Sequence, residues 1–383
     1  MRTIYLDYNA TTPLDPAVRE AMLPFLHEHY GNPSSIHHVG RCSRAALDDA
    51  RERIAAVLCC RPSELVFTSG GTESNNLAIL GTARLLKSRG RHIITSSVEH
   101  HAVLNACEYL AENEGFTLTV LPVDRLGFVS PDALVAAIRP ETTLVSIMAA
   151  NNEIGTLQPI AELGRICRER GIVFHTDAVQ WFGKQPFGRI EDFNADLVSG
   201  CGHKFHGPKG AGFLYIRSPL KPHPLLLGGS HENERRAGTE NVAAIIGLAK
   251  AVELFIREPV FAAKDLLPLR DRLDALTLSL GTLGVTPRSP TKRRLINTVA
   301  FTVRGCDSTS ILAGLDLEGI CASSGSACSA GSLTPSHVML ALGCDRTEAS
   351  SLIRFSLGRE STATDVAEVE RVLPEVIQRA QAT

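Results

Sequence analysis

The stretch Asp196-Leu-Val-Ser-Gly-Cys-Gly-His-Lys204-Phe-His-Gly-Pro-Lys-Gly-Ala-Gly212 places one lysine just after a short apolar run and inside a glycine-rich turn. The apolar run predicts the end of a buried strand, and residues 213–216 predict the next one. The glycines allow backbone or a ligand to approach closely. A partly desolvated Lys204 at this strand exit would have a lowered pKa and could attack a carbonyl to form a Schiff base. A solvated loop lysine is the commoner explanation of a His-Lys pair taken alone.

Apolar runs that predict further strands lie on both sides of this stretch. They fall at 64–69, 92–97, 117–121, 143–149, 172–176, 196–199 and 212–216. Helical periodicity separates several of them, at 43–58, 73–88, 101–114, 131–138 and 159–170. Apolar strands that alternate with helices predict an α/β fold around a large, mixed but mostly parallel sheet.

The pattern changes after about residue 255. Helices are expected near 264–280 and 308–316, and strands near 295–303 and 351–357, which is typical of a smaller α+β domain. Residues 5–12 predict an extended arm that returns to this second part. We therefore expect a large domain over 16–255 and a small domain formed by 1–15 and 256–383.

The composition excludes several classes of protein. The 383 residues carry 39 Lys and Arg against 41 Asp and Glu, so no broad basic field is present for nucleic acid or a membrane surface. The most apolar helical stretch, 242–256, is too short and too polar to span a bilayer, and the N-terminus lacks a signal sequence, which predicts a cytoplasmic location. The ten cysteines include no Cys-x-x-Cys pair, so neither a disulfide scaffold nor a metal site is expected.

The segment Thr68-Ser-Gly-Gly-Thr72 joins a predicted strand to a predicted helix. Free backbone N–H groups, glycines and hydroxyls meet there at a helix N-terminus, which is a geometry that binds phosphate. An ordinary capped helix start explains the same residues equally well. Gly71 and Thr72 are accordingly candidate phosphate ligands.

Other polar residues also follow predicted strands. Asp177 could pair with a ring N–H⁺ of a cofactor, although with Gln180 it also fits a capping box. His100 could stack on such a ring or move protons, and the alternative is a satisfied histidine at a strand end. Asn152 is either a turn residue or a polar ligand. Open α/β sheets bind ligands at the carboxyl ends of their strands, so the coincidence of these positions favours a site.

Two further candidates lie in the second part. Arg354 alternates with Ile353 and Phe355 in a predicted strand, so it either faces solvent or clamps a substrate carboxylate. Cys328 lies in a segment, 321–335, that is almost wholly small and polar and is expected to be mobile. A cysteine on such a loop is a candidate nucleophile, whereas Cys321 is expected to be packed.

Taken together, these motifs resemble the cysteine desulfurases, pyridoxal-phosphate enzymes of the aminotransferase class V family. The resemblance covers nearly the whole chain. It rests on Tyr5-Leu-Asp-Tyr-Asn-Ala-Thr-Thr12, Ser69-Gly-Gly-Thr-Glu-Ser74, Glu99-His100, Asn151-Asn-Glu-Ile-Gly155, Asp177-Ala-Val-Gln180, His203-Lys204, Gly207-Pro-Lys-Gly210, Arg236-Ala-Gly-Thr239, Ser324-Gly-Ser-Ala-Cys328 and Arg354-Phe-Ser-Leu-Gly358. The segment around Cys328 is similar to that of the long-loop branch. The fold implied is the fold type I of pyridoxal-phosphate transferases.

The resemblance implies a role for each candidate. Lys204 would carry pyridoxal 5′-phosphate as a Schiff base, Asp177 would pair with the ring nitrogen, and His100 would stack on the ring. Gln180 and Asn152 would surround the ring oxygen, and Arg354 would hold the substrate carboxylate. The implied phosphate ligands are Gly71, Thr72, Cys201, Gly202, His203 and, from a second subunit of a homodimer, Thr239. The family usually has serine at the position of Cys201.

The implied reaction converts L-cysteine to L-alanine and leaves the sulfur on Cys328 as a persulfide. A sulfur-acceptor protein, such as an iron–sulfur scaffold or a nucleic-acid thiolation enzyme, would receive it. Two alternatives remain open at this stage. One is a class V aminotransferase that acts on a small amino acid, and the other is a catalytically idle scaffold for sulfur-transfer proteins.

Overall fold

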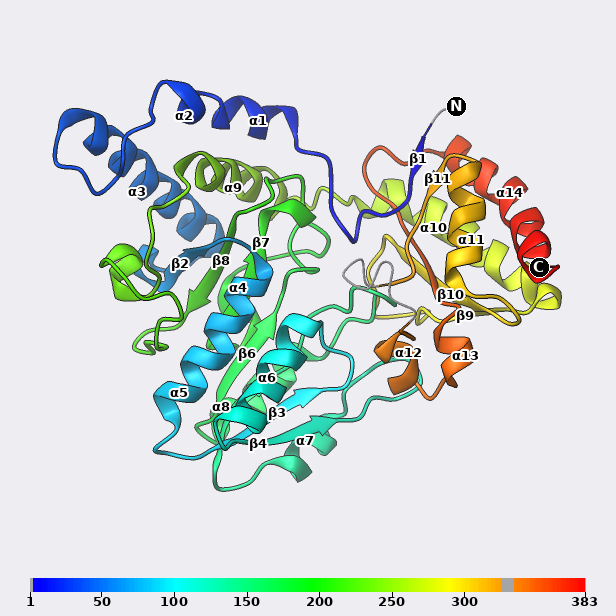
Figure 1. Ribbon diagram of the computed structural model, residues 1–383, viewed down its shortest axis with the longest axis horizontal. Helices are drawn as coiled ribbons and strands as arrows, with labels where there is room; N and C mark the ends of the chain where they lie inside the picture. The colour runs from blue at the N-terminus through cyan, green and yellow to red at the C-terminus, as the bar shows by residue number, and fades with distance from the viewer. Residues whose placement is uncertain (1–2, 326–333, 383) are drawn as a thin grey trace.

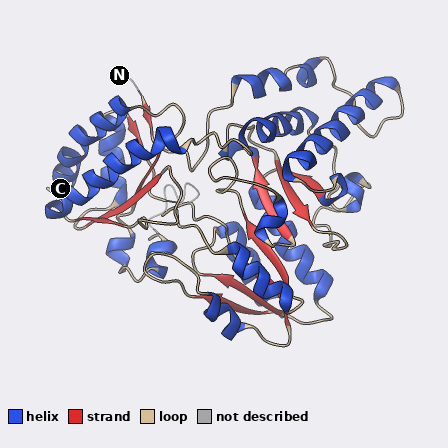
Figure 2. Ribbon diagram, turned by 180° about the vertical axis from the view of Figure 1, so that it is seen from behind, coloured by secondary structure: helices blue, strands red, loops and turns tan. Residues whose placement is uncertain are grey.

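The computed structural model describes residues 3–325 and 334–382 and is built around a seven-stranded sheet (Figures 1 and 2). Its strands are β2 (Leu65–Thr68), β3 (His92–Ser96), β4 (Thr117–Leu121), β5 (Thr142–Ser146), β6 (Val173–Asp177), β7 (Leu197–Cys201) and β8 (Gly212–Ile216). They lie in the order β2-β8-β7-β6-β5-β3-β4. All neighbours are parallel except β8, which is antiparallel to both β7 and β2. The mixed, mostly parallel sheet is confirmed. The reversal at β8 arises because the glycine-rich segment 202–211 returns the chain without a crossover helix.

Helices cover both faces of this sheet, so alternate residues of each strand enter different cores. Val145 and Phe174 pack toward α3 (His38–Leu58), α8 (Ile160–Glu169) and α9 (Val242–Phe255). Leu144 instead packs with residues of α6 (His101–Asn113). The remaining helices of this part are α1 (Pro16–Met22), α2 (Pro24–His27), α4 (Gly71–Asn76), α5 (Thr82–Leu86) and α7 (Pro131–Ala137). The single helix expected over 73–88 is α4 and α5 joined by a π-helical turn.

The second part has its own antiparallel sheet, in the order β12 (Ile353–Ser356), β10 (Thr298–Val303) and β9 (Val285–Pro287). Helices α10 (Ala263–Ser279), α11 (Ser308–Leu317) and α14 (Ala363–Gln381) complete its core, and α12 (His337–Ala341) and α13 (Arg346–Ala349) lie beside it (Figure 1). Neither α14 nor β9 was expected from the sequence.

The N-terminal arm crosses from the large sheet to the second part, as Figure 1 shows. Its strand β1 (Ile4–Tyr5) pairs in parallel with β11 (Ile320–Cys321). Leu6 and Tyr8 are buried in the core of the second part. The arm therefore returns as expected, while the exact domain boundaries stay a prediction. Among the described residues, no helix combines the length and the apolar character that crossing a membrane requires.

Candidate active site

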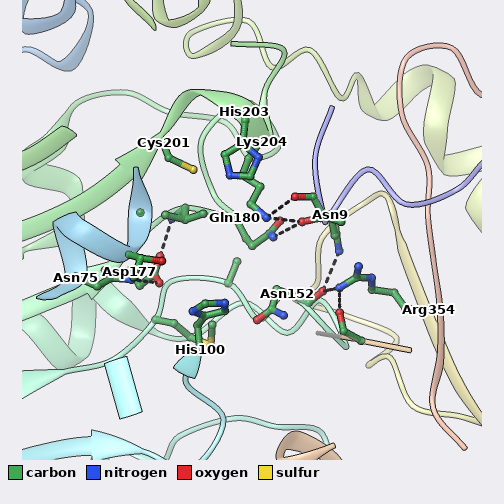
Figure 3. Close-up of a pocket in the computed structure, with 17 residues that line it drawn as sticks. Asn9, Asn75, His100, Asn152, Asp177, Gln180, Cys201, His203, Lys204 and Arg354 are labelled. Carbon is green, nitrogen blue, oxygen red and sulfur yellow. Dashed lines mark hydrogen bonds between the residues drawn. The ribbon is translucent and has the colours of Figure 1, made fainter. Parts of the chain in front are cut away.

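A cavity opens at the carboxyl ends of β5, β6 and β7, at the edge where parallel strands of open sheets place their ligands. It holds about 810 Å³ of space free of protein atoms, counting the solvent at its mouth. The residues that line it are Asn9, Ala10, Gly71, Thr72, Asn75, His100, Met148, Ala150, Asn152, Asp177, Val179, Gln180, Cys201, His203, Lys204, Gly325 and Arg354 (Figure 3). The structure thus brings most of the predicted site residues together, from the large sheet and the second part.

Lys204 lies one short turn beyond the end of β7, and its amine is held from the arm. Its Nζ donates hydrogen bonds to the main-chain oxygens of Asn9 and Ala10, each at 2.8 Å (Figure 3). Burial lowers the pKa of Lys204, and the nearby charge of Arg354 lowers it further. Lys204 is therefore not a solvated loop lysine. Its amine is in the neutral, nucleophilic form over a wider pH range than an ordinary lysine.

Asp177 is the last residue of β6, and its carboxylate is almost fully buried. It accepts hydrogen bonds from Asn75 Nδ2 at 2.6 Å and from the backbone N–H of Val179 at 2.9 Å. Gln180 Nε2 donates to Asn9 O at 2.8 Å and makes no return bond to Asp177. The pair therefore does not act as a capping box. Asp177 presents a buried carboxyl group held by two donors, which suits a cationic N–H group in the cavity.

His100 caps helix α6 from the cavity side. Its Nδ1 accepts a hydrogen bond from the backbone N–H of Ala102 at 3.1 Å, so the neutral ring carries its proton on Nε2. Burial lowers the pKa of His100, and the ring is neutral at physiological pH. A neutral imidazole with a fixed tautomer can stack on an aromatic ligand and exchange a proton at Nε2.

The side of the cavity beside α4 is shaped for an anion. The first N–H groups of α4, from Gly71 and Thr72, have no acceptor within the helix. A Cβ on Gly71 would lie 2.7 Å from Val179 Cγ2, so only glycine lets the backbone approach here. Cys201 and His203 line the same cavity, whereas Gly202 packs instead against Gly207 and Leu248.

The two ionisable groups on this side are uncharged. Burial raises the pKa of the Cys201 thiol to about 11 and lowers the pKa of His203 to about 3. His203 Nδ1 lies 3.1 Å from Thr11 Oγ1. A phosphate bound here would accept hydrogen bonds from neutral donors and from helix N–H groups.

Arg354 projects from β12 into the cavity and is 1% exposed, so the solvent-facing alternative is wrong. Its Nη2 pairs with Asp7 Oδ1 at 2.7 Å, and its Nη1 donates to Asn152 O at 2.7 Å and to Gly325 O. Its Nε is buried and has no partner among the described residues. The guanidinium is thus held by three hydrogen bonds, and its Nε–H is among the donors that stay unused.

One predicted phosphate ligand lies in a different cavity. Thr239 lines a separate cavity with Ser69, Arg236 and Glu240. Cys328 lies outside the described residues. Cys321 in β11 is only partly buried, so its expected packing is incomplete. No cluster of metal-ligating side chains occurs among the residues that the structure describes.

Two residues with central positions were not singled out from the sequence. Asn9 is 1% exposed and bonds to the main chain or side chains of Lys204, Gln180 and Asn152. Asn75 supports Asp177 from α4. For Asn9 the available signal was its place in the polar motif 5–12, but nothing in the sequence places that motif against Lys204.

The cavity, its buried lysine and the fold define the class of protein. The profile of the family "Aminotransferase class-V" matches residues 4–369, and the chain belongs to this family. Among its relatives within the family are cysteine desulfurases. The chain is 51% identical to "Cysteine desulfurase IscS" of Dictyoglomus turgidum, over 99% of this chain and 95% of the relative. It is 50% identical to the protein of the same name from Methanosarcina thermophila, over 99% and 93%.

Solved structures agree with this grouping. A structure described as "NIFS-LIKE PROTEIN" superposes with a TM-score of 0.89 at 37% identity and covers both chains completely. A second, "SspA in complex with cysteine", has a TM-score of 0.82 at 38% identity over 94% of this chain and all of the other. The expected fold type I architecture is confirmed by these likenesses.

Proposed function

We propose that this protein is a cysteine desulfurase that uses pyridoxal 5′-phosphate to convert L-cysteine to L-alanine and passes the sulfur to Cys328. The observation that carries the proposal is the convergence of Lys204, Asp177 and His100 on one cavity that Arg354 closes from the second part. No single motif places these groups together. The resemblance in sequence to desulfurases over 99% of the chain supports the same activity.

The residues present fit the cofactor. Lys204 offers an amine with a lowered pKa, Asp177 offers a buried carboxylate for the ring nitrogen, and the start of α4 offers N–H groups for the phosphate. Asn75 Oδ1 is buried beside Asp177 without a partner among the described residues, so this hydrogen-bond acceptor remains unused in the site. When bound, the cofactor supplies an electron sink for bonds to the substrate's α-carbon. Gly71, Thr72, Cys201 and His203 would hold its phosphate.

Two side chains of the protein, Lys204 and His100, are placed to transfer protons. Lys204 lies just beyond β7 and is held by two carbonyl oxygens of the arm, and its lowered pKa makes it release a proton more readily than an ordinary lysine. His100 presents Nε2 because Nδ1 is occupied by the helix cap. We infer that His100 exchanges the proton that the substrate thiol or amine must lose or gain.

Arg354 is the proposed binding group for the substrate carboxylate. Its unpartnered Nε and its position in the cavity support this role, while Asp7 holds the other edge of the guanidinium. A carboxylate that bonds to Arg354 must share the guanidinium with Asp7 or displace it. Asp7 therefore fixes the direction from which the substrate is held.

Cys328 is the proposed sulfur acceptor. The described chain reaches the cavity just before this segment, since Gly325 lines the cavity and its oxygen accepts from Arg354. From that point three residues lead to Cys328. In the transfer, a Cys328 thiolate forms the new S–S bond while the substrate's C–S bond breaks, and the carbon gains a proton to give alanine. A partner protein, such as an iron–sulfur scaffold or a thiolation enzyme, then takes the sulfur.

A second copy of the chain would complete the site. The strongly exposed apolar side chains include Tyr30 (75%), Ile36 (90%) and Leu227 (84%). The Ser34 hydroxyl lies 3.3 Å from His231 Nε2, so the segment that carries Tyr30 and Ile36 adjoins the one that carries Leu227. Exposed apolar side chains on adjoining segments are typical of a protein interface. Thr239 lies outside the Lys204 cavity of its own chain, and we infer that it serves the phosphate of the partner's cofactor.

The experiment that tests the function is incubation with L-cysteine, with alanine measured and sulfur located by intact-protein mass. The parent is expected to release alanine and to gain one sulfur on the peptide with Cys328. Cys328→Ser keeps the size and polarity of the side chain, but its hydroxyl is scarcely ionised at neutral pH. It should bind the cofactor normally and lose more than roughly 100-fold in alanine release.

Cys321→Ser is the matched control, because Cys321 lies in β11 outside the residues that line the cavity. It should keep most of the turnover. Near-normal alanine release from Cys328→Ser together with an inactive Cys321→Ser would overturn the assignment of the acceptor. Keto-acid-dependent transamination by the parent, without sulfur transfer, would overturn the desulfurase function itself.

A further inference from the structure

A second lysine, Lys184, is buried directly behind the cavity. It is 1% exposed and lies in the turn that follows β6, where Gln180 also lies. Its Nζ donates to Asn9 Oδ1 at 2.6 Å and to Gln180 Oε1, and it lies 5.1 Å from the centre of the Phe261 ring. Lys184 has no carboxylate partner in an ion pair among the described residues. Burial of an amine without a counterion costs free energy, so this lysine is not explained by stability.

The two contacts of Gln180 determine how its amide is turned. Lys184 can only donate, so the oxygen of the Gln180 amide must face it. The main-chain oxygen of Asn9 can only accept, so Gln180 Nε2 must face Asn9, at 2.8 Å. Both contacts specify the same orientation. Because Gln180 lines the cavity and Nε2 carries two protons, one N–H remains for a ligand, and the ligand atom that suits it is an acceptor.

Lys184 fixes a second amide in the same way. Asn9 Oδ1 accepts from Lys184 and from Asn297 Nδ2 at 3.1 Å, which leaves Asn9 Nδ2 to donate to Thr298 Oγ1 at 2.9 Å. The main-chain oxygen of the same Asn9 accepts from Lys204 at 2.8 Å. The Lys184 amine thus holds both Gln180 and Asn9, the two residues that lie between it and Lys204.

We propose that Lys184 is a positioning residue that turns the Gln180 amide so that it offers an N–H, never an oxygen, to the ring oxygen of the bound cofactor, and that holds Asn9 against Lys204. This inference rests on the proposed function, because it assumes pyridoxal 5′-phosphate in the cavity. Lys184 itself does not line the cavity. It acts through Gln180 and Asn9.

Lys184→Met tests the proposal, since methionine fills similar space without a donor. We expect the dissociation constant for pyridoxal 5′-phosphate to rise about 10-fold and the visible absorption maximum of the bound cofactor to shift. In a Gln180→Leu background the same Lys184→Met change should raise the constant less than about 3-fold, because the route through Gln180 is gone and only the contact with Asn9 remains. If Lys184 served only the fold, Lys184→Met would change the midpoint of urea unfolding. It would leave the cofactor spectrum unchanged, and its effect on cofactor affinity would be the same in both backgrounds.

Gln185→Met is the matched control. Gln185 is adjacent, 8% exposed, and its Nε2 has no partner among the described residues, so its cofactor affinity and spectrum should match the parent. If Lys184→Met does not fold, Gln180→Glu tests the N–H that Lys184 is proposed to turn toward the cavity, because a carboxylate still accepts from Lys184 but has no N–H. It should bind the cofactor at least as weakly as Gln180→Leu.

Parent-like affinity and spectrum in Lys184→Met, an equal effect of Lys184→Met in both backgrounds, or parent-like affinity in Gln180→Glu would each overturn the proposal. Failure of the proposed function has a different signature. In that case the parent protein itself would not bind pyridoxal 5′-phosphate or would not release alanine from L-cysteine.

Discussion

The replacement Cys201→Ser should tighten the hold on the cofactor phosphate. Cys201 is 1% exposed at the end of β7 and lines the cavity beside Gly71. Burial raises the pKa of its thiol to about 11, so near neutral pH the side chain is an uncharged S–H. Serine is nearly isosteric but offers an O–H, which is the stronger hydrogen-bond donor.

The size of the effect follows from the donor that is exchanged. A hydrogen bond to a charged group contributes about 1.5–3 kcal/mol, and a thiol realises only part of that. The exchange should therefore be worth about 1 kcal/mol, which corresponds to a roughly fivefold lower dissociation constant. The measurement is equilibrium dialysis against pyridoxal 5′-phosphate at fixed phosphate-free ionic strength.

Cys167→Ser is the control for burial of a hydroxyl. Cys167 is fully buried in α8 and belongs to the apolar core, away from the cavity. It should lower the midpoint of urea unfolding and leave cofactor affinity unchanged. Weaker cofactor binding by Cys201→Ser, at unchanged unfolding midpoint, would refute the reasoning and show that the thiol has another role in the cavity.

Borohydride reduction of the cofactor-loaded protein should fix the cofactor to the peptide with Lys204, because burial lowers the pKa of that amine; labelling of Lys209 instead would contradict the assignment. Glu99 is fully buried, and burial raises the pKa of its carboxyl from 4.5 to about 8, so the folded state binds the proton more tightly than the unfolded state does. The stability that this proton contributes is complete below pH 4.5 and is lost as the pH rises to about 8. In urea titrations Glu99→Gln should therefore be more stable than the parent by on the order of a few kcal/mol at pH 9, and similar to it at pH 4.5. A difference in stability that does not depend on pH would rule this out.

Sequence patterns were most informative where a strand is buried on both sides. The run at 212–216 coincides with β8, whose residues are all buried and divide between two cores. The run at 117–121 also coincides with a strand, β4, although that strand lies at the edge of the sheet and is largely exposed. Helix α14 was missed although its buried residues, among them Val366, Val369 and Leu373, recur at helical spacing. The π-helical turn between α4 and α5 has no periodic signature that distinguishes it from an ordinary helix.

The sequence by itself determined the class of fold and most of the residues that line the cavity. Strand ends carry the chemistry in an open α/β sheet, so Lys204, Asp177 and His100 were candidates from their positions after apolar runs, and the resemblance to a family gave each its role. Those arguments depend only on neighbours within a few residues along the chain.

Only the tertiary structure decided which distant groups touch. Asn9 meets Lys204 across 195 positions of the chain, and Arg354 meets Asp7 across 347. Hydrogen-bond partners at such separations are set by how the arm passes between the two parts, and local propensity does not encode that path. For the same reason Lys184 reads as an ordinary polar residue in the sequence, and its position behind Gln180 and Asn9 is visible only in the folded chain.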